Sequence, residues 1–146
     1  MSFINAVYQV LEEERSSNYP EVETIIKHSV TGVKKGCFIL LDPEDEEYIS
    51  SGNKWQCISQ QMNIVLLKHI DKSSSYPDMI DSTKNIAKKV IGILKKNKRL
   101  VSSSFPEGFL INSKILRNEN RLTVYQNRDY TYQKIVLIGK YMRRLQ

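Results

Sequence analysis

Residues 55–70, which read WQCISQQMNIVLLKHI, carry the clearest strand pattern in the chain. Apolar and polar side chains alternate along them with the period of two that turns one face of a β-strand toward a core. The stretch is long for one strand, so we expect a bend or bulge near Gln60 and Gln61. The apolar set is Ile58, Met62, Ile64, Leu66 and Ile70.

Upstream of this strand, residues 2–11 are predicted to form a short amphipathic helix. Ser2 is a suitable N-cap, and Phe3, Val7 and Leu11 fall on one face. Three acidic residues, Glu12, Glu13 and Glu14, follow at the end where the helix dipole disfavours negative charge. This unfavourable placement indicates either that the helix ends early or that the acidic groups meet basic groups from outside the helix.

Two further strands are predicted between that helix and residue 55. Residues 21–30 and 34–41 are rich in β-branched and other apolar side chains, and Thr31-Gly32 between them indicates a turn. Residues 42–47 read DPEDEE and are interpreted as a solvated acidic loop. The alternating Asp spacing of a calcium loop is absent there.

The strongest helix pattern covers residues 77–96. A proline stands in the first turn, and Asp78 and Asp81 suit the positive end of the dipole. Apolar residues recur at helical spacing on one face, and lysines occupy the opposite face. The lysines of that face are Lys84, Lys88, Lys95 and Lys96.

The C-terminal third is predicted to return to strands after a loop at residues 102–108. Residues 109–116 and 121–126 are expected to pair around Asn118-Glu119-Asn120, and a turn at 127–129 leads to a last strand at 130–142. The apolar run 135–138 is typical of an internal strand covered on both faces. Residues 1–146 are therefore expected to form one α+β domain, in which a mainly antiparallel sheet packs against the N-terminal helix and one long central helix.

Composition places the chain among ordinary globular proteins. It has 146 residues, 40% hydrophobic content and a net charge of +6, which weakly favours a polyanionic neighbour. The N-terminus does not have the pattern of a signal peptide, and the apolar runs fall far short of the roughly 20 residues that span a bilayer. We expect no membrane partner.

We expect no catalytic residue, no metal site and no cofactor. His28, His69, Cys37 and Cys57 are scattered without the short spacings of a zinc site, and neither cysteine carries a nucleophile signature. Lys34-Lys35-Gly36 lacks the remainder of a phosphate loop. Function is therefore expected in surfaces that meet other chains.

Three alternatives stay open at this stage. A small basic nucleic-acid-binding protein would use the lysine face, with Tyr125, Tyr130, Tyr132 and Tyr141 either stacking bases or packing across the sheet. A non-catalytic cellular adaptor domain would stay monomeric or dimeric. An enzyme would need a concave site with convergent polar groups.

The order of elements resembles that of the tail-terminator and tail-completion proteins of tailed bacteriophages. This family implies an α/β sandwich, a virion location after assembly in the host cytoplasm, and a hexameric or dodecameric ring. The ring would lie between the portal or adaptor proteins and the tail, and DNA would pass through it without being read. The stretches that carry the resemblance are residues 2–11, 55–70, 77–96 and 130–141.

The charges suggest how such a ring would be held together. Acidic side chains of one subunit would meet the lysine face of the next, through the heterologous contacts that close rings. The candidate interface residues are Glu12, Glu13, Glu14, Asp42, Glu44, Asp45, Lys84, Lys88, Lys95 and Lys96.

Overall fold

A computed structural model describes residues 2–28, 36–70, 76–125 and 128–145. The predicted turn at Thr31-Gly32, the serines at 73–75 and Asn127 lie outside these ranges. The elements, in chain order, are α1 (Phe3–Asn18), β1 (Val22–Lys27), β2 (Cys37–Ser51), β3 (Trp55–His69), α2 (Tyr76–Lys96), β4 (Asn112–Tyr125) and β5 (Arg128–Arg144).

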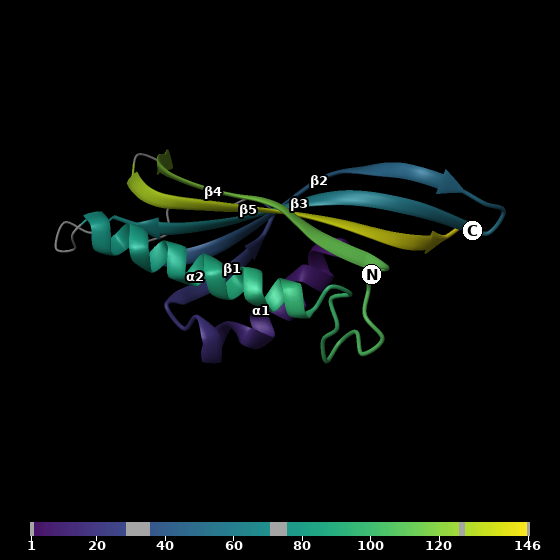
Figure 1. Ribbon diagram of the computed structural model, residues 1–146, viewed down its shortest axis with the longest axis horizontal. Helices are drawn as coiled ribbons and strands as arrows, with labels where there is room; N and C mark the ends of the chain where they lie inside the picture. Colours follow the sequence, from purple (N-terminus) through teal and green to yellow (C-terminus); the bar gives the residue numbers. More distant parts are fainter. Residues whose placement is uncertain (1, 29–35, 71–75, 126–127, 146) are drawn as a thin grey trace.

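The strands form one five-stranded sheet in the order β1-β2-β3-β5-β4. β1 runs parallel to β2, and the other neighbouring pairs are antiparallel. Both helices lie against the same face of the sheet, as Figure 1 shows, and they contact each other there. The structure is thus a mixed α/β fold with a mainly antiparallel sheet.

The main core lies between the helices and the sheet. The apolar alternation of β3 is confirmed for Ile58, Met62, Ile64 and Leu66, which face the helices and are each at most 1% exposed. Ile70 lies just beyond the end of β3. From the helices, the main contributors to this core are Val7, Val10, Leu11, Ile86, Val90 and Leu94.

A second apolar cluster lies on the face of the sheet opposite the helices. Val65 and Leu67 of β3 pack there with Phe38 and Tyr130. β3 therefore buries side chains on both faces, which explains why its apolar residues become continuous from Ile64 onward. β5 is also buried on both faces. Ile135, Val136 and Leu137 are each 1% exposed, which confirms the predicted internal strand.

α1 is longer than predicted. The hydroxyl of Ser2 accepts a hydrogen bond from the amide of Asn5 at 3.4 Å, as expected of an N-cap. The helix continues through the acidic residues to Asn18, so an early end is wrong. Arg15 and Asn18, one turn further on, bind the carboxylates of Glu12 and Glu14, and this contact offsets the unfavourable dipole.

The acidic segment 42–47 is strand and not loop, which corrects the prediction. β2 continues through it to Ser51, because β3 offers a backbone ladder along its whole length. The register shifts between Pro43 and Glu46, opposite Gln60 and Gln61. The expected irregularity is therefore present at the predicted level, but the extra residue belongs to β2.

The two strands predicted around Asn118-Glu119-Asn120 are one strand, β4. These turn-forming residues pair with Ile135, Lys134 and Gln133 of β5, so ladder hydrogen bonds override the local turn preference. The register of β4 shifts once, between Ile115 and Arg117. β4 forms one edge of the sheet and β1 the other.

The ends of β2, β3 and β5 project beyond the helices (Figure 1). We call this projection, residues 44–57 and 142–145, the arm. At its tip the amide of Gly52 donates to the carbonyl of Trp55 at 2.7 Å, and Leu145 donates to Lys54 at 2.7 Å. The tip of the arm is therefore held by strand pairing.

Two glycines provide a matched test of packing. A Cβ at Gly139 of β5 would lie 2.9 Å from Cζ of Phe3 and 3.0 Å from Cδ1 of Leu110, whereas a Cβ at Gly92 of α2 meets no atom within 4 Å. We expect Gly139→Val to lower the free energy of unfolding by about 1–3 kcal/mol through overpacking. Gly92→Ala should raise it by about 0.5–1 kcal/mol through helix propensity. Urea denaturation measures both, and a Gly139→Val midpoint at or above that of the wild type would contradict the packing described.

Candidate functional site

The acidic residues of α1 are engaged within their own subunit. Glu12 forms an ion pair with Arg15 at 3.0 Å, and Glu14 accepts a hydrogen bond from Asn18 at 2.5 Å. Glu13 accepts from the backbone amide of Ser103 at 2.9 Å and also from its hydroxyl. These carboxylates fix the end of α1 and the loop after α2, so they are the weakest members of the proposed interface set.

The acidic residues of β2 are more available. Asp42, Asp45 and Glu47 are exposed, and Glu44 is exposed but accepts a hydrogen bond from the amide of Asn63 at 3.0 Å. Because these residues all belong to β2, next to the edge strand β1, the available negative charge gathers at one side of the sheet.

Glu46 differs from its neighbours because it joins two strands of the arm. Its carboxylate forms an ion pair with Arg143 of β5 at 3.0 Å, across β3. A hydrogen bond to Tyr48, and then the charge of Glu46, raise the pKa of the Arg143 guanidinium. Both partners are half-exposed, so the pair adds little free energy and mainly sets the position of the side chains.

The lysines of α2 lie on its exposed side and give the protein a basic surface. Lys84, Lys88, Lys95 and Lys96 are exposed, and none of them has an ion pair among the described residues. The sequence holds no acidic residue between Asp81 and Glu107. The structure does not bring this basic surface and the acidic part of β2 together, because the strand order places β2 and α2 contacts on different parts of the sheet.

The arm carries exposed apolar side chains that sequence reasoning missed. Tyr48 is 60% exposed, Ile49 49%, Trp55 48% and Met142 45%. Gathered apolar side chains on a surface often mark a contact with another molecule. The signal in the sequence is a Tyr-Ile pair directly after the acidic run.

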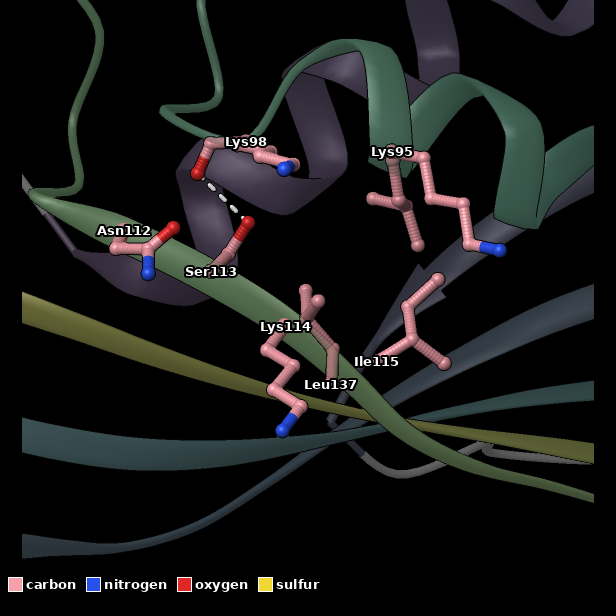
Figure 2. A pocket seen from close by; sticks show the side chains of 8 residues that line it. Lys95, Lys98, Asn112, Ser113, Lys114, Ile115 and Leu137 are labelled. Carbon is pink, nitrogen blue, oxygen red and sulfur yellow. Dashed lines mark hydrogen bonds between the residues drawn. The ribbon is translucent and has the colours of Figure 1, made fainter.

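A groove lies between the C-terminal end of α2 and β4, and its volume is about 570 Å³. Figure 2 shows Lys95 and Lys98 on its helical side and Ile115 on its sheet side. The hydroxyl of Ser113 donates to the carbonyl of Lys98 at 2.6 Å, which fixes β4 to the end of the helix. The groove thus has apolar walls and a basic rim.

Tyr130, Tyr132 and Tyr141 pack within the fold, and the side chain of Tyr125 lies outside the described part of the structure. Tyr130 is fully buried and meets Phe38 and His69 edge-on, with ring centroids 5.9 Å and 5.5 Å apart. Tyr141 is 7% exposed and lies against Phe3 and Phe109. Neither ring offers a face on which a base could stack.

The remaining candidates for chemistry do not converge. Within the described residues, no three His, Cys, Asp or Glu side chains gather as metal ligands would. None of the described helices is long and apolar enough to cross a membrane. Cys37 and Cys57 are both free, and their partners in the ladder, Lys68 and Met142, lie at opposite ends of the sheet.

Comparison with known proteins gives a match in structure. No protein-family model matches the sequence, and no curated protein is significantly similar to it. The fold is similar to that of a chain in a solved structure described as the virion of a native gene transfer agent particle. The TM-score is 0.71 at 20% sequence identity, over 97% of this chain and 96% of that chain. The two chains therefore share their fold over nearly their whole lengths.

The two cysteines should differ in reactivity. Burial raises the pKa of the Cys37 thiol to about 12, so at pH 8 it is protonated as well as covered. Cys57 is only partly buried. We expect iodoacetamide at pH 8 to label Cys57 alone in the folded protein and both cysteines in guanidinium chloride, as read by peptide mass spectrometry. Equal labelling of the two in the native state would show that the core around Cys37 opens readily.

Proposed function

We propose that this chain is a structural subunit of a phage-like virion that forms a ring at the head–tail junction, as a connector or tail terminator. The observation that carries the proposal is the shared fold with a chain of a gene transfer agent virion, over nearly the full length of both chains. The order of helices and strands that resembles the tail-terminator family supports the same proposal. The role is structural and not catalytic.

The distribution of charge supports head-to-tail association. Acidic side chains of β2 and lysines of α2 occupy separate surfaces of one subunit, so neither can satisfy the other internally. A contact between two different patches repeats from copy to copy and closes into a ring when the rotation allows it. Complementary charge also steers the encounter and excludes wrong orientations. A hexamer or dodecamer of single-domain subunits is the proposed assembly.

In this ring the neighbours are the portal or adaptor proteins on one side and tail proteins on the other. DNA passes through the lumen without sequence-specific contact. The net charge of +6 suits a surface that faces DNA, since lysines left outside the subunit contacts attract phosphates without reading bases. The protein assembles in the host cytoplasm and remains in the virion.

The lysine surface favours a second candidate function, a small basic nucleic-acid-binding protein. Seven basic side chains would then neutralise phosphates, and affinity would fall steeply with salt. A stable monomer that binds duplex DNA in this way would favour the second candidate. The basic residues concerned are Lys84, Lys88, Lys89, Lys95, Lys96, Lys98 and Arg99.

A charge reversal on β2 tests the ring. We expect Asp42→Lys combined with Asp45→Lys and Glu47→Lys to abolish assembly while the circular dichroism spectrum of the monomer is retained. Glu44 is left in place because it holds the amides of Gln61 and Asn63. Light scattering at low and moderate salt gives the mass of the assembly, and the wild type is measured beside the variant, alone and with its tail-side neighbour.

The matched control makes the same change of charge elsewhere, at Glu21, Glu23 and Glu107, which are also exposed. This control should assemble like the wild type. Rings of undiminished mass in the β2 variant would remove β2 from the interface. A wild type that forms no ring, even beside its neighbour, would contradict the proposed function itself.

A further inference from the structure

We propose that the arm of one subunit docks into the groove between α2 and β4 of the next copy of this chain. Ile49 would lie over the apolar wall of the groove, and Glu47 would lie between Lys95 and Lys98. The inference rests on the proposed ring and names the contact that builds it.

The arm presents Ile49 in an unusual way. β2 and β3 pair Tyr48 with Ile58 and Ser50 with Cys57, so Ile49 is an extra residue without a partner in the ladder. Such a bulge re-aims a side chain away from the regular alternation of the strand. Ile49 is 49% exposed, and the exposed residues Glu47 and Tyr48 precede it directly. The arm therefore offers an apolar knob beside a carboxylate.

The groove has the complementary arrangement. Its deep walls, Leu94 and Leu137, are 2% and 1% exposed, and Ile115 is the partly accessible apolar residue. The stems of Lys95 and Lys98 extend the apolar surface at the rim and carry their charges at its edge (Figure 2). A volume of about 570 Å³ is enough to hold one or two large side chains.

The order of the strands makes the contact one between subunits. The knob belongs to β2 and the groove to β4, and β3 and β5 lie between these two strands in the sheet. Figure 1 shows the arm leading away from the helices and not folding back over them. Ile49 therefore cannot reach the groove of its own chain. Because knob and groove are different surfaces, the contact is heterologous and repeats around a ring.

A second copy fits the groove better than DNA does. Phosphates would pair with Lys95 and Lys98 but would leave Ile115 and the apolar knob of the arm in water. A neighbouring arm covers both apolar groups and brings the exposed carboxylates of Asp45 and Glu47 to the lysines. Each contact between an arm and a groove is small. Closure of the ring makes the last of these contacts intramolecular, and this strengthens the assembly.

The first experiment exchanges charges between two variants of the full chain. The arm variant carries Asp45→Lys and Glu47→Lys, and the groove variant carries Lys95→Glu and Lys98→Glu. Each alone should raise the concentration for half-assembly at least tenfold. Mixed in equal amounts, they should recover assembly, because every arm of one variant then meets the groove of the other with opposite charge. The recovered particles should contain the two chains alternately and in equal number.

A control variant with Lys84→Glu and Lys88→Glu makes the same charge change on α2, outside the groove. Alone it should assemble, because its arm and its groove are unchanged, and mixed with the arm variant it should leave that chain outside the particles. Equal incorporation of the arm variant in both mixtures would mean that charge acts over the whole face of α2, and would overturn docking at the groove.

A cysteine pair tests the contact itself, without depending on a stable ring. Ile49→Cys and Ile115→Cys are combined with Cys57→Ser, and Cys37 is kept because it is buried. Mild oxidation should give a ladder of covalent dimers, trimers and larger species on non-reducing gels. Ile49→Cys with Cys57→Ser but without Ile115→Cys should stop at dimers. Rings in the wild type without a ladder in this variant would overturn the docking contact and leave the proposed function standing. Neither rings nor a ladder would overturn both.

Discussion

The fold depends on β3, which is paired on both sides and buried on both faces. β2 and β5 bind its two edges from end to end, and its middle part contributes to both apolar clusters. A fully buried Ile or Leu contributes about 1.5–3 kcal/mol, whereas an exposed ion pair contributes about 0–1 kcal/mol. The stability of the sheet therefore comes from the inner part of β3, and the outer part is free to carry function. The arm exists because the same strand continues beyond the helices that cover its other half (Figure 1).

The elements that sequence predicted well are those in which burial follows a simple period. α2 turns one apolar stripe toward the sheet and β3 turns one regularly spaced apolar set toward the helices, and both were found within one residue of the predicted bounds. The acidic part of β2 and the middle of β4 were misassigned for one reason. Local composition there favours a loop, but a long neighbouring strand supplies ladder hydrogen bonds that override it. Strand order and the parallel pairing of β1 arise from contacts distant in sequence, which a local pattern does not contain.

Of the candidate site, the sequence predicted only the charged residues. The lysines of α2 and the carboxylates of Asp42, Glu44 and Asp45 in β2 are exposed as expected, because burial of an unpaired charge is costly. The acidic residues of α1 were in the set for the same reason, but Arg15, Asn18 and Ser103 bind them. The apolar knob was missed because its exposure follows from a bulge, and the groove was missed because it forms between two elements separated by a loop. Both features depend on how strands are paired.

The position of β4 at the edge of the sheet also limits how copies of the chain can assemble. β4 is the outermost strand of the sheet, and an outermost strand presents unpaired backbone groups to any other chain. Lys114, Arg117 and Glu119 project from it, and Arg117 and Glu119 bind each other at 3.2 Å. A neighbouring strand that approached this edge would have to desolvate these charges and follow the register shift at Leu116. The same strand that forms a wall of the groove thus resists strand-by-strand addition, which would otherwise lead to fibrils of unlimited length in place of particles of fixed size.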